Sequence, residues 1–511
     1  LCVQWDVGIV ADLEVTGLEV TQAVQDLNNS VRLVAGKRTF VRLHARSAQD
    51  DWRTFATLAV SCDNFGRILL PINPGTNGYI AVREAPNRNV QNHAFLFELP
   101  SDCTDEAEQI RISGQVNPTT SWRGEYPPEN NILNNWSGEY FITFENAPQL
   151  DTIVYLADYQ TSDGTDYGTS TTDAYMLRSW LERANPVADT QLIVREIDLG
   201  QVTVNVTGTI TSPDSDDFNA ELAAKRDWDV ADVNWYESIT GGERHIRYYG
   251  MIDDAGGFMR GSSADIPSTV ASGPTGDGRW AWDTDGSFGD WYGGHEIGHT
   301  LGRFHVNCNG REVGPDASYP HTGGLISTAT TGDDAFFGFD SGDLVDGIYG
   351  PTWSDVMSYC SWQWISDYTT HGILDYMQNN FAADRAVAAA GSHLQVVGTI
   401  DANSGVTKLK PLFVLPSVID AEPPVPGDYA IVLRDGAGEL ARYAFTPTPM
   451  DPGPPSPDAP QASEPARLLI SEMVPFVSGT DQVVIEGPSG VLAEVSAGSS
   501  TPSVTVLAPN G

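Results

Sequence analysis

The chain has 511 residues, a hydrophobic content of 41% and a formal net charge of −40 at pH 7, from 68 acidic and 28 basic residues. This length exceeds what one hydrophobic core usually holds and favours about three or four domains. The acidic balance excludes nucleic-acid binding through phosphate contacts, and no apolar run reaches the roughly 18 residues that a membrane span needs.

Residues 1–148 are predicted to form an all-β, Ig-like sandwich. Short segments rich in β-branched and aromatic residues follow one another at the spacing typical of such folds. Residues 31–43 read as two strands around an Ala-Gly turn, and Pro148 marks the predicted boundary. The further strands are expected at residues 56–62, 79–83, 93–99, 109–114 and 139–144.

Residues 149–392 alternate strand and helix patterns, which predicts an α/β domain. Strands are expected at 152–156, 192–197 and 245–252, and helices at 173–183, 218–226 and 290–301. A last helix is expected after Ser366 or Asp367, either of which can cap it. Its apolar positions recur at helical spacing and are Ile373, Leu374, Met377 and Phe381.

Residues 393–511 return to strand patterns and predict a second, C-terminal β-sandwich. Segments 429–434 and 439–445 flank an Asp-Gly-Ala-Gly sequence, which is typical of a β-hairpin. A proline-rich stretch, 447–465, is expected to be a loop. The remaining strands are expected at residues 482–485, 491–495 and 503–507.

The most specific motif in the chain lies in the third predicted helix of the α/β domain. Residues 295–305 read H-E-I-G-H-T-L-G-R-F-H, so His295 and His299 are four positions apart on one helix face and can bind one metal ion. Glu296 lies beside them, where its carboxylate can accept a proton from a metal-bound water. This pattern predicts a zinc-dependent peptidase site.

The third histidine, His305, requires the helix to end. A continuing helix turns by about 100° per residue and would direct His305 away from His299. Gly302 provides the turn, because glycine adopts positive φ at little cost. Three histidine ligands leave a fourth position open for water, which is typical of a catalytic zinc site rather than a structural one.

A second motif, S-D-V-M-S-Y-C at 354–360, follows the zinc motif about fifty residues later. Together the two segments resemble the metzincin clan of metallopeptidases, whose long zinc motif is followed by a Met-turn. The resemblance covers the α/β domain and implies a metzincin-like fold. A looser likeness is to bacterial secreted metallopeptidases with Ig-like flanking domains, including mucin-cleaving ones.

The resemblance implies roles for two residues of the second motif. Met357 would lie beneath the metal as an apolar floor, although a methionine alone would be an ordinary core residue. Tyr359 matches the Met-x-Tyr arrangement of serralysins and astacins, in which a tyrosine binds or leaves the zinc; plain packing is the alternative. Two departures separate the chain from those subfamilies, because Val306 replaces the glutamate of astacins and the glycine-aspartate repeats of serralysins are missing.

The resemblance also implies how substrate binds. In the family, the strand before the zinc helix forms the edge of the sheet and pairs with an extended peptide, and residues 268–272 are the candidate for this strand here. Pairing of this kind bonds the main chain, while pockets select side chains. The expected partner is therefore a protein or glycoprotein substrate bound as an extended strand, and the flanking sandwiches are candidates for contact with glycan or a cell surface.

Five cysteines leave one without a partner in the chain. In the metzincin geometry the segments that carry Cys308 and Cys360 converge below the zinc, so the resemblance implies a disulfide between them. Cys62 and Cys103 lie in separate strand-like segments and form the second predicted pair. Such bridges indicate an oxidising compartment. Cys2 is left over and is a candidate for lipid attachment, although no lipobox is present.

Calcium is a second candidate ion. Residues 283–286 and 214–217 contain clustered carboxylates, but neither segment completes an EF-hand spacing, and solvated acidic loops are the alternative. The histidines outside the zinc motif are expected to be surface or structural residues rather than ligands. They are His44, His93, His245, His321, His371 and His393.

The sequence therefore predicts a secreted zinc metalloendopeptidase. His295, His299 and His305 would bind the metal, Glu296 would act as the general base, and Tyr359 would assist. Gly302, Met357, Cys308 and Cys360 would support the site. The alternative is a surface adhesin or glycan-binding protein with a vestigial metal domain; Glu296 favours the enzyme, because a structural zinc site does not need a carboxylate at that position.

Overall fold

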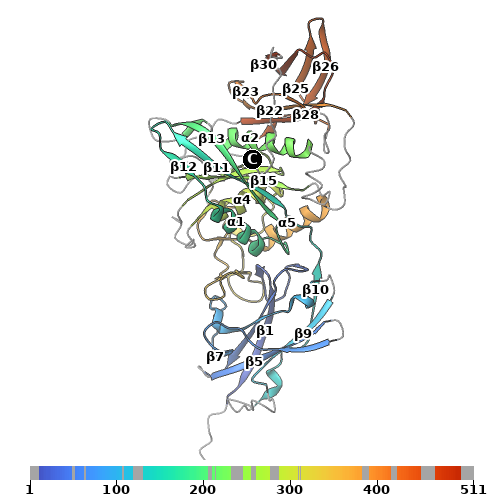
Figure 1. Ribbon diagram of the computed structural model, residues 1–511. Coiled ribbons are helices and arrows are strands. Elements are labelled where there is room, and N and C mark those ends of the chain that lie inside the picture. Colours follow the sequence, from blue (N-terminus) through green and yellow to red (C-terminus); the bar gives the residue numbers. More distant parts are fainter. Residues whose placement is uncertain are drawn as a thin grey trace, which may run out of the picture.

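A computed structural model describes residues 11–48, 52–62, 65–105, 109–118, 131–204, 210–212, 215–231, 245–254, 261–276, 287–308, 310, 312, 314–381, 391–415, 423–450 and 467–496. This part of the chain is rich in β-structure and forms several sheets with helices concentrated in the middle (Figure 1). The described helices include none that combines the length and the apolar content of a membrane span.

The N-terminal part is a sandwich of two sheets. One sheet has the strand order β1-β4-β8, and the other has the order β3-β10-β9-β5-β6, with β7 paired to β5. Side chains from both sheets meet in one core, for example Val41 from the first and Leu58 and Ile112 from the second. The strands are β1 (Leu13–Thr21), β3 (Leu33–Val34), β4 (Phe40–Ser47), β5 (Trp52–Cys62), β6 (Phe65–Leu69), β7 (Tyr79–Val82), β8 (Ala94–Glu98), β9 (Gln109–Val116) and β10 (Tyr140–Glu145).

The middle part is built on a sheet with the order β14-β13-β11-β15-β17-β16, and β12 pairs with β11. Strands β13, β11, β15 and β17 are parallel, whereas β16 is antiparallel to β17. The strands are β11 (Thr152–Thr161), β12 (Asp166–Gly168), β13 (Leu192–Val204), β14 (Ile210–Ser212), β15 (Arg247–Asp253), β16 (Ser262–Ser263) and β17 (Val270–Thr275).

Helices cover both faces of this sheet. On one face, α1 (Thr171–Ala184), α4 (Gly289–Thr300) and α5 (Asp367–Asn380) enclose a core that includes Leu177, Ile297 and Met377. On the other face, α2 (Ser215–Ala231) packs Phe218 and Leu222 against the sheet. Parallel strands with helices on both faces form a three-layer α/β arrangement.

The structure corrects the predicted edge strand. Residues 268–272 contribute to β17, which pairs with β15 on one side and with β16 on the other, so β17 lies inside the sheet. Among the described strands the two-residue strand β16 comes last in the order of the sheet, and its residues Ser262 and Ser263 are fully buried. The sequence pattern failed here because two polar residues carry no strand signature of their own.

The N-terminal sandwich and the middle part are joined by a shared sheet and a shared core. Strand β2 (Val24–Gln25) pairs with β18 (Phe337–Phe339), which also pairs with β19 (Ile348–Tyr349). The indole nitrogen of Trp364 donates a hydrogen bond of 2.8 Å to the carbonyl of Ala23. The predicted boundary at Pro148 falls between β10 and β11, yet elements on its two sides depend on each other for burial.

The C-terminal part is a second two-sheet sandwich. One sheet has the order β23-β22-β28-β27, with β24 paired to β22, and the other has the order β26-β25-β29-β30. Its core includes Val396, Ile431, Ile470 and Ile485. The strands are β22 (His393–Asp401), β23 (Thr407–Leu409), β24 (Phe413–Leu415), β25 (Tyr429–Asp435), β26 (Gly438–Phe445), β27 (Thr448–Pro449), β28 (Arg467–Pro475), β29 (Gln482–Gly487) and β30 (Gly490–Ser496).

This C-terminal sandwich packs on helix α2 (Figure 1). Lys408 pairs with Asp217 at 3.0 Å, and Lys410 pairs with Glu221 at 2.9 Å. The amide of Gln395 donates to the carboxylate of Asp227 at 3.0 Å. Opposite charges thus face each other across the contact, which fixes its register more than it adds affinity.

Most predicted elements correspond to observed ones. The predicted hairpin is present as β25 and β26. Ser366 is the cap of α5, because its side chain accepts a hydrogen bond from the amide of Thr369. The expected loop 447–465 begins with the short strand β27, and its remaining part from residue 451 onward lies outside the described residues, as does the expected strand 503–507.

A candidate metal centre

Helix α4, which carries the motif, is buried along its whole length. Four of its residues are glycines, and they allow neighbouring elements to approach closely. A Cβ atom at Gly293 would collide with Leu177, and one at Gly294 would collide with Trp180, both on α1. A helix without an exposed face lies inside a core, so the middle part is built around α4.

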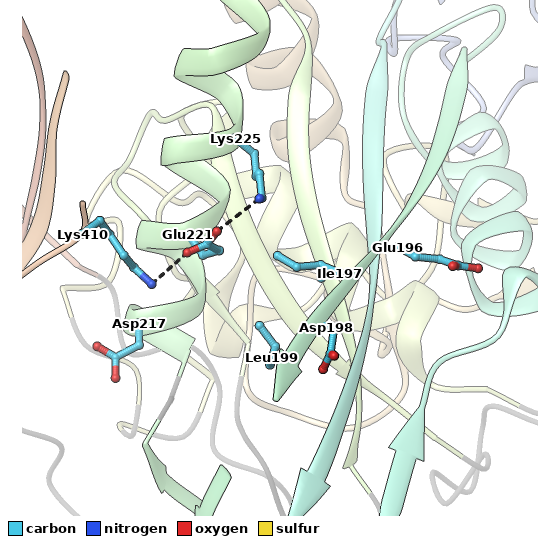
Figure 2. Close-up of a pocket in the computed structure, with 8 residues that line it drawn as sticks. All are labelled: Glu196, Ile197, Asp198, Leu199, Asp217, Glu221, Lys225 and Lys410. Carbon is cyan, nitrogen blue, oxygen red and sulfur yellow. Dashed lines mark ion pairs between the residues drawn. The ribbon is translucent and has the colours of Figure 1, made fainter. Parts of the chain in front are cut away.

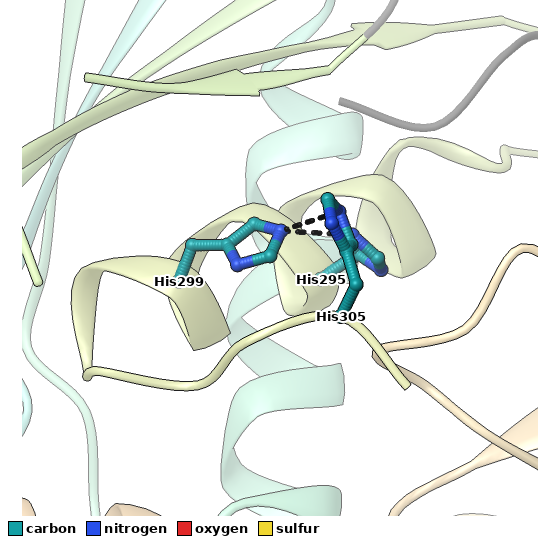
Figure 3. Close-up of side chains that lie close together, drawn as sticks. All are labelled: His295, His299 and His305. Atoms are coloured by element: carbon teal, nitrogen blue, oxygen red, sulfur yellow. Dashed lines mark hydrogen bonds between the residues drawn. The ribbon is translucent and has the colours of Figure 1, made fainter. Parts of the chain in front are cut away.

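The helix ends as its sequence predicts. Gly302 has φ 77°, its amide donates to the carbonyl of His299 at 2.9 Å, and the amide of Arg303 donates to the carbonyl of Gly298 at 3.0 Å. These two bonds are the Schellman arrangement, in which a glycine in the left-handed region closes a helix. The chain then turns back toward the helix and carries His305 to the other motif histidines (Figure 3).

The three imidazoles converge through the same ring atom. The Nε2 atom of His299 lies 3.0 Å from Nε2 of His295 and 3.1 Å from Nε2 of His305. All three residues are buried. The only other group of three metal-ligating side chains among the described residues is Cys308, Glu312 and Cys360, and its two sulfur atoms are joined in a disulfide.

The nitrogen spacing fits a metal ion with tetrahedral coordination. Nitrogen ligands at 2.0–2.1 Å from a tetrahedral zinc lie about 3.3 Å apart, close to the spacing of these atoms. Burial and the neighbouring His305 hold the pKa of His299 well below its ordinary value, which favours the neutral, metal-binding imidazole. The residues present therefore fit a three-histidine metal site, and three nitrogens suit several divalent ions besides zinc.

Backbone carbonyls orient two of the rings. Nδ1 of His295 lies 2.7 Å from the carbonyl oxygen of Val356, and Nδ1 of His299 lies 2.7 Å from that of Arg303. A carbonyl can only accept, so the proton of each neutral ring sits on Nδ1 and the lone pair of Nε2 faces the centre. This is the protonation state that a metal ligand requires.

Met357 packs against helix α4, which carries the motif. A Cβ atom at Gly298 would lie 2.6 Å from the Sδ atom of Met357, so the thioether fills the space that this glycine leaves. The carbonyl of Met357 also accepts a hydrogen bond of 2.8 Å from the amide of Val306. The Met-turn thus contacts both the helix and the segment after His305.

A buried carboxylate holds the Met-turn in place. Asp355 accepts from the amide of Met357 at 2.7 Å and from the hydroxyl of Thr369 at 2.8 Å. It also accepts from the amide of Ser366 at 3.2 Å, the residue that caps α5. Burial raises the pKa of Asp355 above its usual value, and these hydrogen bonds only partly offset this effect. Asp355 therefore fixes the turn to the start of α5.

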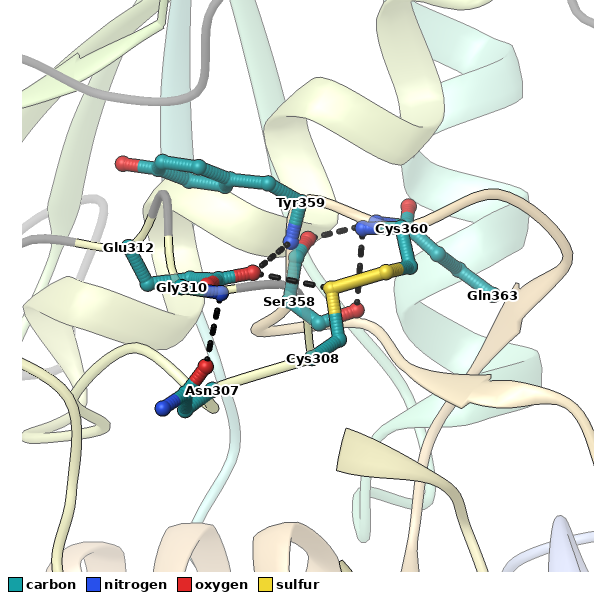
Figure 4. The surroundings of a disulfide bond; sticks show 8 residues. All are labelled: Asn307, Cys308, Gly310, Glu312, Ser358, Tyr359, Cys360 and Gln363. Carbon is teal, nitrogen blue, oxygen red and sulfur yellow. Dashed lines mark hydrogen bonds between the residues drawn. A yellow bond between two sulfur atoms is a disulfide. The ribbon is translucent and has the colours of Figure 1, made fainter. Parts of the chain in front are cut away.

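Tyr359 and both cysteines of the predicted bridge lie beside the histidines. The hydroxyl of Tyr359 is 2.9 Å from Nε2 of His305, and the amide of Tyr359 donates to Glu312 at 3.2 Å. Cys308 and Cys360 form a disulfide with a Cα–Cα distance of 6.2 Å (Figure 4). The second predicted pair, Cys62 with Cys103, also forms a disulfide, and Cys2 lies outside the described residues.

Glu296 is buried and lies against the edge strand. A Cβ atom at Gly261, the residue before β16, would overlap the carboxylate of Glu296. The backbone of the sheet edge therefore passes directly beside the motif glutamate. Sequence reasoning missed Gly261, Gly298 and Asp355, because a single glycine or aspartate has no meaning until the partner that faces it is known.

The other predicted metal residues are accounted for differently. Residues 283–286 and Asp214 lie outside the described part of the chain. Asp216 and Asp217 face Arg467 at 3.6 and 3.7 Å, so these carboxylates are engaged in ion pairs. The histidines outside the motif make structural contacts; for example, Nε2 of His321 lies 2.6 Å from Asp367.

A cavity of about 500 Å³ lies between β13, α2 and the C-terminal sandwich (Figure 2). Glu221 in its wall lies 3.4 Å from Lys225 and 2.9 Å from Lys410. The remaining walls carry Glu196, Asp198 and Asp217. This set of charges supports the packing of the sandwich on α2 and offers no nucleophile or metal-ligating histidine.

No protein-family model matches this chain, and no curated protein is significantly similar to it in sequence. The functional conclusion therefore rests on the residues and the geometry of the histidine site.

Proposed function

We propose that the protein is a zinc metalloendopeptidase of the metzincin type. The observation that carries the proposal is the convergence of three Nε2 atoms, with spacings of 3.0 and 3.1 Å, next to a helix that carries Glu296 directly after the first histidine. Zinc bound by three imidazoles would lower the pKa of a water molecule to about 7 and polarise a scissile carbonyl. A structural site with three histidines has no use for the adjacent carboxylate.

Glu296 handles the proton in this proposal. It accepts the proton of the attacking water and delivers it to the leaving amine, which needs a carboxylate within hydrogen-bond reach of the reacting atoms. Its burial beside the edge strand limits the directions in which the carboxylate can turn. A fixed base of this kind contributes through orientation as much as through its pKa.

Tyr359 stabilises the oxyanion in this proposal. Its hydroxyl already lies 2.9 Å from Nε2 of His305, so it can reach a group bound at the centre of the three nitrogens. A donor aimed at a developing oxyanion contributes about 3–4 kcal/mol in other enzymes. The disulfide between Cys308 and Cys360 holds this tyrosine next to the third histidine.

The substrate is a protein or glycoprotein bound as an extended strand in this proposal, because main-chain pairing lets a peptidase bind peptides of many sequences. Two disulfides support an oxidising, extracellular setting for a protein substrate.

The decisive experiment is Glu296→Ala in the zinc-loaded protein. We expect unchanged zinc content by metal analysis and a loss of casein cleavage by a factor of about 10² or more, because proton transfer by a positioned carboxylate contributes about 10²–10⁴-fold. The matched control is Glu14→Ala, whose side chain forms an exposed ion pair in the N-terminal sandwich. Undiminished turnover by Glu296→Ala would contradict the mechanism.

A further inference from the structure

Asp316 follows the third motif histidine, and its side chain is turned into the protein. Its sequence neighbours on both sides are exposed, whereas only 15% of the Asp316 side chain is exposed. The carboxylate accepts from the amide of Ser318 at 2.8 Å and from the hydroxyl of Tyr368 at 2.7 Å, and it lies 3.7 Å from the guanidinium of Arg303. The side chain is therefore fixed in place, whereas a carboxylate on an exposed segment is usually solvated.

The backbone of Asp316 is bonded to the third histidine itself. The amide of Asp316 donates to the carbonyl of His305 at 2.8 Å, and the amide of Val306 donates to the carbonyl of Met357 at 2.8 Å. That carbonyl and the amide of Val306 belong to one peptide group, so both of its polar atoms are held. These two bonds fix the direction in which the imidazole of His305 leaves the backbone.

Arg303 is connected in the same way to the second histidine. Its carbonyl oxygen lies 2.7 Å from Nδ1 of His299, and its amide donates to the carbonyl of Gly298 at 3.0 Å. The backbone of Arg303 thus orients one ring, while its guanidinium faces the carboxylate of Asp316. One ion pair therefore joins the two backbone positions that set the second and third imidazoles.

Helix α5 provides a notch for this guanidinium. The Cζ atom of Arg303 lies 5.0 Å from the ring centroid of Tyr368, whose hydroxyl donates to Asp316. A Cβ atom at Gly372, one turn further along α5, would overlap the guanidinium. A planar cation that packs on a ring and faces a carboxylate suits arginine, whereas the ammonium of lysine lacks this flat shape. The notch therefore selects Arg303 by shape as well as by charge.

We propose that Asp316 and Arg303 form a clamp that retains the metal ion, with Asp316 as its central positioning residue. Loss of the pair frees the backbone at two ligands, so the ion leaves faster although all three imidazoles are still present. Removal of a group that orients metal ligands typically lowers metal affinity about 10–100-fold. The inference rests on the proposed function only for its metal centre. Because zinc release is measured without substrate, the two proposals can fail independently.

The first experiment measures how fast zinc leaves the loaded protein into an excess of chromogenic chelator. We expect Asp316→Asn and Arg303→Lys each to release zinc at least about tenfold faster than the wild type. The matched control is Arg183→Lys, because Arg183 on α1 also forms a partly buried ion pair, with Asp340, and also packs against a glycine, Gly342. This control should lose stability and keep the release rate of the wild type.

Two outcomes of this measurement would overturn the clamp. Wild-type release rates in both Asp316→Asn and Arg303→Lys would do so, whatever the casein assay shows. An equal acceleration in Arg183→Lys would do so as well, because the loss of any partly buried pair would then suffice. If the wild type cleaves no casein but only the two clamp variants release zinc faster, the clamp stands and the peptidase proposal fails.

The second experiment tests whether the two residues act as one unit and through the ligands. We expect the double variant of Asp316→Asn and Arg303→Lys to release zinc no more than about twofold faster than the faster single variant, because either change already breaks the pair. With Co²⁺ in place of zinc, the visible absorption should differ from the wild type in these variants and match it in Arg183→Lys. Effects that multiply in the double variant, or unchanged Co²⁺ bands, would contradict the clamp.

Discussion

The backbone of Gly261 lies so close to the carboxylate of Glu296 that a Cβ atom at position 261 would overlap this side chain. Both groups come from elements that pack on each other, because β16 is the edge of the sheet that α4 covers. The glycine therefore sets the position of the proposed base.

Gly261→Ala should impair catalysis without removing the metal. The added methyl group would displace the Glu296 carboxylate, and a misplacement of about 1 Å can lower the rate by about 10²-fold. We expect zinc content near that of the wild type, a Tm lowered by overpacking of the buried site, and kcat reduced with KM little changed. Gly66→Ala is the control, since nothing lies within 4 Å of a Cβ atom at that position. Full activity of Gly261→Ala would show that this contact does not position the base.

Zinc should stabilise the folded protein through the histidine site. Three ligands that face one another in the folded state bind the ion far better than the unfolded chain does. Added zinc at about 100 times Kd should therefore raise the free energy of unfolding by about 2.7 kcal/mol. We expect the Tm of chelator-treated protein to rise on zinc addition. His299→Ala should abolish most of this rise, because it removes the ligand atom that lies 3.0 and 3.1 Å from the other two.

His93→Ala provides the matched control for the zinc titration. His93 belongs to a short helical turn of the N-terminal sandwich, where its Nδ1 accepts from the amide of Asn87 at 2.9 Å. Its removal should leave the zinc-dependent rise in Tm unchanged. An equal rise in Tm for His299→Ala and wild type would place the zinc elsewhere in the protein.

The three-histidine motif could be predicted because its geometry is local in sequence. His295 and His299 are related by helix geometry alone, and Gly302 reveals the turn through its freedom to adopt positive φ. The pairing of Cys308 with Cys360 followed from the resemblance to metzincins. Each of these features depends on a few residues, and the type of each residue already indicates its role.

The parts that could not be predicted depend on contacts between distant segments. The edge strand was misplaced because β16 consists of two serines, and its pairing with β17 is visible only once the sheet is assembled. Likewise Asp355 reads as an ordinary loop residue until Thr369 is found 2.8 Å away. The bond from Trp364 to Ala23 joins residues more than three hundred positions apart, so no local pattern shows that the N-terminal sandwich shares the core of α4.

The disulfide between Cys308 and Cys360 should stabilise both the fold and the metal site. The bridge closes a loop with a sequence separation of 52, for which chain entropy gives about 4 kcal/mol. Replacing both cysteines by serine should lower the free energy of unfolding by roughly this amount. It should also weaken zinc binding, because His305 and Tyr359 lie on the two bridged segments.

The other disulfide separates these two effects. Replacing Cys62 and Cys103 by serine opens a loop with a sequence separation of 41 and should cost a similar amount of stability. Both residues lie in the core of the N-terminal sandwich, so the zinc affinity should not change. Unfolding by urea and competition of zinc with a chromogenic chelator measure the two quantities. Equal zinc affinity in both double variants would contradict the supporting role of Cys308 and Cys360.

A buried ion-pair network in the N-terminal sandwich should make its stability dependent on pH. The Glu19 carboxylate is buried and lies 3.4 Å from Arg42, 3.1 Å from Arg88 and 3.1 Å from His44. Burial alone would raise the pKa of Glu19, but the attraction of Arg42 and the other partners lowers it to about 2. Because the folded pKa lies below the unfolded one, the stabilisation is complete above about pH 4.5 and is lost as pH falls toward 2.

Glu19→Gln should therefore destabilise the protein strongly at neutral pH and much less in acid. Removing one partner leaves Arg42 as an uncompensated buried charge, which costs about 3–5 kcal/mol. Glu14→Gln is the matched control on the same strand, since Glu14 pairs with Arg46 at an exposed position where such pairs contribute about 0–1 kcal/mol. Urea unfolding of both variants and the wild type at pH 7 and at pH 3 measures the difference. A penalty for Glu19→Gln that does not shrink at pH 3 would show that packing, rather than the charge of Glu19, holds the network together.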